Sequence, residues 1–437
     1  MVAHLQRAPY SAPVSDDDLT RLREHLIGES RRCVREPAGR FRHRWLAPMP
    51  SPSGATGGWG EDQSFASGDY GAALFHHDVS ESAIELARDL ELAEACFGSL
   101  LCFLDTATPE GRVHRIEMPF RARDPEPAKP CMAQLALRAV DGIERGLERA
   151  DEARVLPRLI AFARYLERET TGLHGLLLTP SCRASGFDSD VLSAGLPDFS
   201  VEGPDTNALM VLELEAIAEL ARRLGSDATA REHEERAASL RERIEALLWD
   251  DDARTYVALR WKHGAAGRQD EIVGHRDHEG RFRPLRSWIS ILPLYAGIAS
   301  PERASAVLDA LLDPAQHWGP AGVRTVPADD VYFHQAPRVM VYDPRRGERG
   351  PVSNWSGPVW VLSNYYAFVA LRRYGREREA RALAETTARV LAEDLRETGA
   401  LHECYDDAGR GLWPRRGTFV SWNVLALTML RESASPA

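Results

Sequence analysis

Cysteines and long hydrophobic runs are both scarce in this chain. The 437 residues include six cysteines, and no two of them form a C-x-x-C pair, so the sequence indicates neither a zinc site nor a disulfide framework. No stretch approaches the ~18 consecutive apolar residues that a membrane helix needs, and the N-terminal residues lack the apolar core of a secretory signal. These absences predict a cytoplasmic protein with reduced thiols and no membrane partner.

Basic residues are in the minority. Lys and Arg number 54 against 65 Asp and Glu, which gives a formal net charge of −11. Nucleic acids and anionic surfaces are bound through clustered Lys and Arg, so we expect no nucleic-acid partner. The composition, 44% hydrophobic and 27% charged, is that of a globular protein long enough to bury a large core without a metal. The sequence does not indicate an oligomeric state.

The dominant period of the sequence is helical. Over 207–224 apolar residues recur every three or four positions, which predicts an amphipathic helix that Asp205 or Thr206 caps. A more charged helix is predicted over 228–248. The short turn that begins at Gly225 would join the two helices into an antiparallel hairpin.

The same helical unit recurs along the chain, while strand signals are short and local. Because strands and helices do not alternate, a doubly wound sheet or a β/α barrel is disfavoured. Long segments rich in Gly, Pro and Asp connect the helix pairs, and such loops usually carry function. We therefore predict an all-α helical toroid with a site at one mouth. Other helices are expected near 16–35, 81–106, 130–149, 152–169, 286–298, 301–313, 355–374, 377–395 and 417–432, and strands near 255–260, 281–284 and 339–342.

The sequence divides unevenly into an N-terminal extension or cap over 1–60 and one large unit over 61–437. Residues 51–60, SPSGATGGWG, have the composition of a linker or a loop.

Two polar loop clusters contain candidate catalytic carboxylates. Asp188 lies in the string SGFDSD just before the helix at 207, and Glu403 lies in HECYDD, which follows another predicted helix. One carboxylic acid and one carboxylate suit acid–base chemistry. By themselves such short strings are common, and many Asp and Glu residues lie on the surface.

A third candidate feature is the aromatic segment over 354–364. Trp355 and Trp360 offer flat apolar faces on which a sugar ring can lie. The alternative is that Trp360 belongs to the helix core and Trp355 anchors a loop. Pro358 is expected at an early helical position.

Taken together, these strings resemble glycoside hydrolase family 63, in the branch of the mannosylglycerate and glucosylglycerate hydrolases, and more distantly the trehalases. The resemblance runs from about Tyr70 to Leu430 and depends on the order and spacing of its strings. They are HHDVS (76–80), SGFDSD (185–190), DTNALMVLELEAIAELA (205–221), ALLWD (246–250), PLYAGIASPERA (293–304), GVRTVPADDVYF (322–333), NWSGPVWVLSNYY (354–366), HECYDDAGRG (402–411) and TFVSWNVLAL (418–427).

The resemblance implies an (α/α)6 toroid and an inverting glycosidase that acts on a small-molecule glycoside without a metal or an organic cofactor. It makes Asp188 the general acid and Glu403 the general base, and it assigns to Asp78 the binding of sugar hydroxyls. Inversion requires the two catalytic carboxyls to lie about 6.5–9.5 Å apart. The residues that the resemblance places around the pocket are Trp355, Trp360, His402, Tyr405 and Trp422.

The chain departs from the family pattern at three places. The family carries Trp-Asp at the position of His77-Asp78, Glu at the position of Ala184, and Trp-Arg-Gly-Pro where this chain has Ser356 after Trp355. These changes keep the catalytic pair and alter the polar groups expected around the bound sugar. They leave open a second function, in which the same acid and base act on a non-sugar substrate such as a natural-product intermediate.

Several other residues have two interpretations each. His77 is either a pocket residue that replaces the Trp or a buried histidine with a structural role. Arg183 is either a ligand of a substrate carboxylate or a solvated loop arginine. The pair Asp329-Asp330 lacks further oxygen ligands nearby, so no metal site is expected there. No nucleophile role is expected for Cys404.

Overall fold

The protein was analysed as a computed structural model. The structure describes residues 14–50, 71, 73–120, 126–142, 149–182, 184, 187–188, 190–193, 195–260, 271–276, 279–335, 355–413 and 417–434. Arg183, the linker over 51–60 and the strand expected over 339–342 lie outside the described residues.

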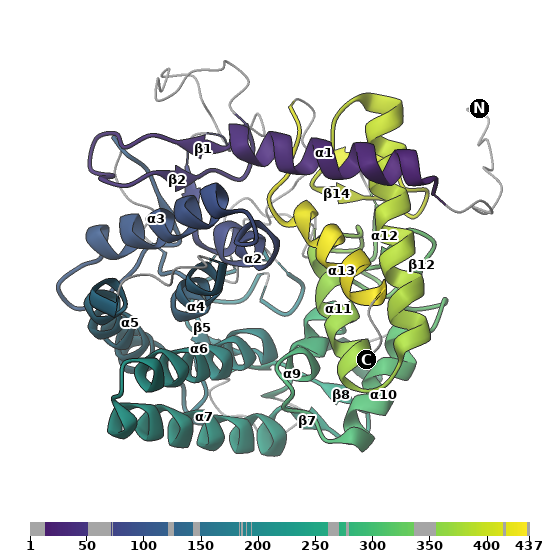
Figure 1. Cartoon of the computed structure of the whole chain (residues 1–437). Coiled ribbons are helices and arrows are strands. Elements are labelled where there is room, and N and C mark those ends of the chain that lie inside the picture. Colours follow the sequence, from purple (N-terminus) through teal and green to yellow (C-terminus); the bar gives the residue numbers. More distant parts are fainter. Residues whose placement is uncertain are drawn as a thin grey trace.

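An inner ring of helices closes on itself (Figure 1). Each of these helices contacts the next along the chain, and the last, α13, contacts the first, α2. This closed order confirms the predicted toroid. The inner helices are α2 (His76–Leu86), α4 (Met132–Gly142), α6 (Pro204–Arg223), α9 (Leu292–Tyr295), α11 (Val361–Arg373) and α13 (Leu425–Ala434).

A second set of helices packs around this ring. In this set α3 packs on α4, both α5 and α7 on α6, and α12 on α11 and α13. The predicted hairpin over 207–248 is confirmed as α6 and α7. The outer helices are α1 (Asp16–Arg32), α3 (Leu90–Thr106), α5 (Arg149–Thr170), α7 (Asp227–Leu247), α10 (Pro301–Leu311) and α12 (Glu377–Thr398).

The two sets differ in which faces they bury. The inner helix α6 buries residues on nearly every side, whereas α7 buries a narrow stripe that includes Ala230, His233, Ala237 and Leu240 and leaves charged residues outside. A helix that is apolar all round belongs in a core, and one with a single apolar stripe belongs on a surface.

Short antiparallel strand pairs sit between the helices. The pairs are β1 (Val34–Arg35) with β2 (Trp45–Leu46), β3 (Leu74–Phe75) with β4 (Ile116–Glu117), β7 (Trp249–Asp250) with β8 (Thr255–Tyr256), β10 (Gly274–Arg276) with β11 (Phe282–Pro284), β12 (Trp318–Gly319) with β13 (Gly322–Val323), and β14 (Cys404–Tyr405) with β15 (Gly411–Trp413). A three-stranded sheet contains β5 (Leu178–Thr179), β6 (Val201–Glu202) and β9 (Leu259–Arg260). The strands expected at 255–260 and 281–284 are thus present as β8, β9 and β11.

Several predicted helix ends were wrong because caps and prolines were assigned to the wrong positions. The helix expected over 81–106 is two helices, α2 and α3. They are separate because the Asp89 side chain caps α3 by accepting hydrogen bonds from the amides of Glu91 and Leu92 at 3.1 and 3.3 Å. Asp205 is not a cap, since α6 begins at Pro204 with Gly203 as its N-cap. Pro358 lies before α11, whose N-cap is Trp360.

Two further helices are shorter than expected. The segment expected as a helix over 286–298 is a 3-10 turn, η2 (Trp288–Ile291), followed by α9. The segment over 417–432 similarly contains a 3-10 turn, η4 (Trp422–Val424), before α13.

The described part of the N-terminal segment shares the core of the toroid. Leu22 and Leu26 of α1 are fully buried in the same hydrophobic cluster as the inner helices. In Figure 1 α1, in purple, crosses the top of the ring, and it contacts α12. The division at residue 60 stays a prediction. No helix among the described residues is both long and apolar enough to span a membrane.

Candidate active site

Three carboxyl groups from distant parts of the chain meet in one region. Asp78 lies in the first turn of α2, Asp188 in the loop between β5 and β6, and Glu403 directly before β14. Burial, with repulsion from Asp78 and Asp188, raises the pKa of Glu403 well above its usual range. Burial also raises the pKa of Asp78 to about 7, against the lowering effect of a hydrogen bond from Ser421 and with a further contribution from Asp188. The fold therefore brings together the three carboxyl groups for which the sequence predicted roles.

Asp78 is held by the C-terminal part of the chain. The Ser421 hydroxyl donates to Asp78 Oδ1 at 2.8 Å, and the Ser82 hydroxyl donates to the Asp78 carbonyl at 2.6 Å. The Ser421 bond holds the carboxyl at the junction of α2 with η4, where the ring closes, and the Ser82 bond ties the backbone of the same residue.

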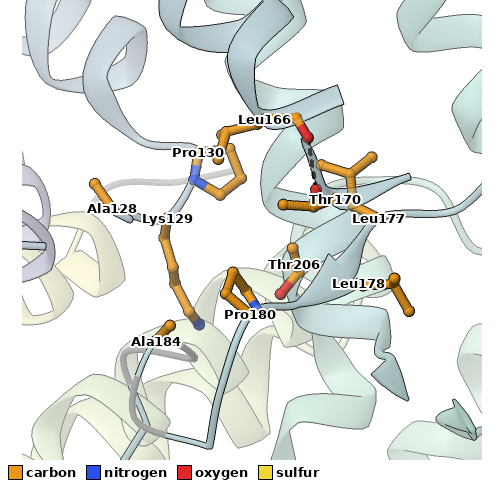
Figure 2. A pocket seen from close by; sticks show the side chains of 10 residues that line it. All are labelled: Ala128, Lys129, Pro130, Leu166, Thr170, Leu177, Leu178, Pro180, Ala184 and Thr206. Carbon is orange, nitrogen blue, oxygen red and sulfur yellow. Dashed lines mark hydrogen bonds between the residues drawn. The ribbon is translucent and has the colours of Figure 1, made fainter. Parts of the chain in front are cut away.

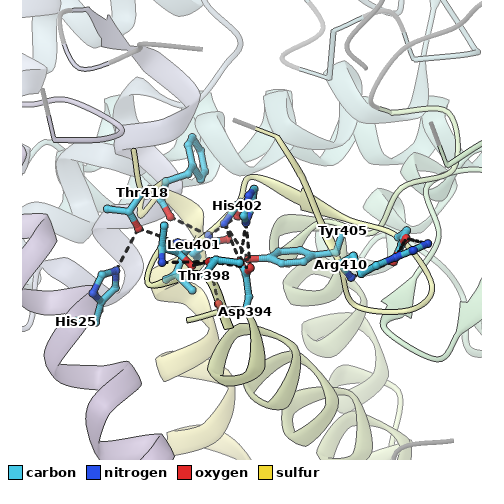
Figure 3. A network of polar contacts seen from close by, with 12 residues as sticks. His25, Asp394, Thr398, Leu401, His402, Tyr405, Arg410 and Thr418 are labelled. Carbon is cyan, nitrogen blue, oxygen red and sulfur yellow. Dashed lines mark hydrogen bonds and ion pairs between the residues drawn. The ribbon is translucent and has the colours of Figure 1, made fainter. Parts of the chain in front are cut away.

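Glu403 is positioned by its chain neighbours. Tyr405 pairs with Val359 through two backbone hydrogen bonds, and its hydroxyl donates to Asp394 of α12 at 2.9 Å. The His402 ring Nδ1 also contacts Asp394, at 2.9 Å (Figure 3). Tyr405 is 1% exposed, so these two residues hold the Glu403 segment in place. Their predicted contact with substrate stays a prediction.

Asp188 is more exposed than Glu403. Its side chain is 44% exposed, and Arg115 Nη1 lies 3.0 Å from its Oδ1. On one side of Asp188, the Lys129 ammonium lies 3.5 Å from the centre of the Phe187 ring. On the other side, Asp190 accepts a hydrogen bond from the Ser287 hydroxyl at 2.6 Å. The loop is thus fixed immediately before and after Asp188.

Stacked aromatic rings connect the segments that carry the three carboxyls. Trp355 and Trp360 stack with their centroids 3.8 Å apart, and Phe187 lies edge-on to Trp355 at 5.1 Å. His77 lies between Phe187 at 5.2 Å and Trp422 at 6.1 Å. The exposed fractions of Trp355, Trp360 and Trp422 are 3%, 2% and 4%. The rings are therefore packed together, and the role of the two tryptophans in sugar binding stays a prediction.

His77, for which the resemblance predicted Trp, is 2% exposed and lies with its Nε2 3.2 Å from the Tyr366 hydroxyl. Ser356, at the second changed position, is fully buried. Both changes therefore lie inside the packed structure.

Ala184, at the third changed position, lines a small cavity (Figure 2). The volume is about 10 Å³, enough for about one water molecule. Figure 2 shows Lys129 reaching across it from the segment before α4 toward Ala184. Lys129 pairs with Asp205 at 3.2 Å, so Asp205 holds a buried cation where the sequence predicted a cap. The cavity is lined by Ala128, Lys129, Pro130, Leu166, Thr170, Leu177, Leu178, Pro180, Ala184 and Thr206.

Within the described part of the chain, no group of three or more His, Cys, Asp or Glu residues is arranged to hold a metal ion. Asp329 instead pairs with Arg286 at 2.8 Å, and Asp330 accepts a hydrogen bond from the amide of Tyr332 at 3.0 Å.

Sequence reasoning missed four residues that hold the site: Arg115, Lys129, Ser421 and Trp288. Arg115 and Lys129 lie in the long connection between the helices expected over 81–106 and 130–149. Ser421 lies inside a string of the resemblance, one residue before Trp422. No local pattern distinguishes any of these residues from an ordinary loop residue.

Comparisons with known proteins agree with this architecture. Neighbours in structure include the family 63 mannosylglycerate hydrolase from Thermus thermophilus in complex with glucose, with a TM-score of 0.65 and 20% identity over 94% of this chain and 100% of that chain. Another is the neutral trehalase Nth1 from Saccharomyces cerevisiae, with a TM-score of 0.57 and 16% identity over 82% of this chain and 71% of that one. At these identities the likeness shows the six-hairpin toroid fold.

Sequence relatives extend the comparison to the family. The mannosylglycerate hydrolase of Rubrobacter radiotolerans is 29% identical over 196 residues, which are 45% of this chain and 37% of that protein. The probable mannosyl-oligosaccharide glucosidase of Schizosaccharomyces pombe is 26% identical over 161 residues, 34% of this chain and 18% of that protein. The chain thus matches well under half the length of either relative. Residues 103–420 match the family described as the mannosylglycerate hydrolase MGH1-like glycoside hydrolase domain, and the chain belongs to that family.

Proposed function

We propose that the protein hydrolyses a small α-glycoside with inversion of the anomeric configuration. Asp188 serves as the general acid, Glu403 as the general base, and Asp78 binds sugar hydroxyls. The observation that carries this proposal is the meeting of these three carboxyls, from α2, the β5–β6 loop and the start of β14: Asp188 contributes to the raised pKa of Asp78, and both aspartates contribute to the raised pKa of Glu403. Membership of a glycoside hydrolase family supports it.

The exposure of the two catalytic carboxyls suits these roles. Asp188, 44% exposed, can be reached by a leaving group, and it protonates the glycosidic oxygen as the bond from that oxygen to the anomeric carbon breaks. Glu403, 8% exposed, takes a proton from a water whose oxygen attacks that carbon on the opposite face. The charge that develops on the sugar ring in the transition state favours an ionised Glu403 at that moment.

The substrate class follows from the relatives. The Rubrobacter radiotolerans relative is a mannosylglycerate hydrolase, and we propose a glycosyl acid of this kind or a short oligosaccharide as the substrate. The second candidate, acid–base chemistry on a non-sugar molecule, depends on the changes at His77, Ala184 and Ser356. The retained carboxyl cluster supports the glycosidase.

The experiment is proton NMR of the purified protein with glucosylglycerate, mannosylglycerate, trehalose and short α-glucans. Release of a sugar that appears first as the β-anomer, by wild type and not by Glu403→Gln, is the expected result. Glu385→Gln is the matched control, because Glu385 is an exposed glutamate of α12. No release from any member of the panel would overturn the proposal and favour a non-sugar substrate.

A further inference from the structure

Arg115 is held rigidly beside the first inner helix. Its carbonyl accepts hydrogen bonds from the amide of His76 at 3.1 Å and from the His76 ring at 2.9 Å, and its own amide donates to Glu126 at 3.0 Å. The next residue, Ile116, pairs with Phe75 in the β3–β4 ladder. The backbone from which the guanidinium extends is therefore fixed relative to α2, the helix that carries Asp78.

The guanidinium of Arg115 is in direct contact with Asp188. Its side chain is 13% exposed, and the Nη1–Oδ1 distance is 3.0 Å. A contact of this kind stabilises the ionised carboxylate and fixes its orientation. A general acid, however, must be protonated when the glycosidic bond breaks.

Other charged and titratable groups among the described residues surround the β5–β6 loop, which carries Asp188. Asp78 faces it from α2 and Glu403 from the start of β14. The ring of His77 contacts Phe187. Lys129 lies against the same Phe187 ring and pairs with Asp205, and Asp190, within the loop, is bonded to Ser287.

We propose that Arg115 is a positioning residue for the acid: it holds Asp188 as an ionised carboxylate in the unliganded protein, and this contact opens when the leaving group enters. Opening lets Asp188 take up the proton that it later donates. This inference rests on the proposed function, because it assigns to Asp188 the acid role.

The proton balance of the pair is preserved by this step. Burial, with repulsion from Asp78 and Asp188, raises the pKa of Glu403, so Glu403 holds a proton more tightly than an exposed glutamate does. Moving one proton from Glu403 to Asp188 converts the resting pair into the working pair of one acid and one base. The total number of protons on the two carboxyls stays the same.

The first test needs no substrate. Carbon-13 NMR of protein labelled at the aspartate carboxyl carbon follows the titration of Asp188, assigned by its absence in Asp188→Asn. We expect the midpoint to rise by about one pH unit in Arg115→Gln, on the scale of an opposite charge removed from within ~4–6 Å. Arg115→Lys keeps a cation and should stay closer to wild type. The control is Arg158→Gln, which breaks the exposed pair of Arg158 with Asp105.

A measurement on wild type tests the same contact even if Arg115→Gln does not fold. Because Asp188 is partly exposed, salt screens its contact with Arg115, and its midpoint should rise between about 0.05 M and 1 M NaCl. A midpoint that moves neither with salt nor in Arg115→Gln overturns the proposal.

The second test uses a hydrolysed substrate. The acidic limb of the kcat/KM profile, which in this pair reports the titration of Asp188 in the free protein, should move to higher pH in Arg115→Gln and return toward wild type in Arg115→Lys. A purely structural role lowers the whole profile without moving the limb, and that result overturns the proposal. If wild type hydrolyses no glycoside, the proposed function fails, whereas the NMR titration still decides the Arg115–Asp188 contact.

Discussion

Val359 and Tyr405 exchange both of their backbone hydrogen bonds, each at 2.8 Å. This pair joins the segment that leads into α11 to the strand that follows Glu403. The general base proposed for this enzyme is thus two residues from a backbone contact, and the Tyr405 side chain is tied in turn to Asp394 of α12. The position of Glu403 therefore depends on both helices of the α11–α12 hairpin.

Tyr405→Phe tests this dependence. The change removes the hydroxyl that donates to Asp394, while the amide and ring of His402 still contact that carboxyl. We expect a loss of about 1.5–3 kcal/mol in the free energy of unfolding, typical of a hydrogen bond to a charged group. We also expect kcat to fall more than KM rises, because Glu403 loses part of its support. Unchanged kcat with the stability loss intact would assign Tyr405 a structural role alone.

Asp188→Asn and Glu403→Gln should each lower kcat by about 10²- to 10⁴-fold, the range attributed to a positioned acid or base. Both substitutions keep the shape of the side chain, so thermal melting should stay near wild type. Asp252→Asn, at an exposed loop position, and Glu385→Gln are the matched controls. Full activity in either catalytic variant would exclude the mechanism.

The raised pKa of Asp78 predicts how stability depends on pH. Burial raises that pKa from 3.8 to about 7, so between these values the folded protein holds a proton that the unfolded chain has lost. Folded stability therefore falls as the pH rises through this window. Asp78→Asn, which retains an oxygen that accepts from Ser421, should gain roughly 1–3 kcal/mol relative to wild type between pH 4.5 and pH 8. Melting temperatures of the two proteins at both pH values measure the difference, and a constant difference would contradict the prediction.

Lys129 and Asp205 form a buried pair in which the exposed fractions of the two side chains are 1% and 3%. Lys129→Met leaves the Asp205 carboxylate without this partner and should cost about 3–5 kcal/mol, measured by urea unfolding. The double change Lys129→Met with Asp205→Asn should recover a large part of that loss, since it removes the Asp205 charge that the single change leaves without its partner. A double variant as unstable as the single one would show that packing of Lys129 on Phe187, rather than its charge, is what matters.

His77→Trp introduces the residue that the resemblance predicted at this position, and we expect it to destabilise this chain. His77 is buried between Phe187 and Trp422, so the larger ring overpacks the site at a cost of about 1–3 kcal/mol. His77→Gln, similar in size, serves as the comparison. A more stable His77→Trp protein would mean that the site has room for the larger ring.

The architecture could be predicted because the helical periodicity recurs many times along the sequence. The hairpin over 207–248 follows from apolar spacing and a Gly-containing turn, and its recurrence indicates a toroid. Helix ends were harder to predict. Asp89 breaks one predicted helix and Asp205 caps none, since the same residue type serves as a cap in one place and as a buried ion-pair partner in another.

The candidate site could be predicted only at residues that lie in the sequence strings of the resemblance. Asp188, Glu403 and Asp78 lie in recognisable strings, and the fold brings them together. The roles of Arg115 and Ser421 could be recognised only in the structure. Arg115 is 73 residues from Asp188 in the sequence, and Ser421 is 343 residues from Asp78. A single sequence contains no local signal for such pairs.

The hydrogen bond between Ser421 and Asp78 also has a consequence for synthesis on the ribosome. One of the three carboxyls cannot acquire its partner until translation has passed residue 421, and α2 cannot meet α13 before that helix emerges. Nascent chains must therefore keep the apolar flank of α2 uncovered while the intervening hairpins are made, a state in which chaperones are most needed. Catalytic competence should appear abruptly, once α13 has left the ribosome, rather than growing hairpin by hairpin.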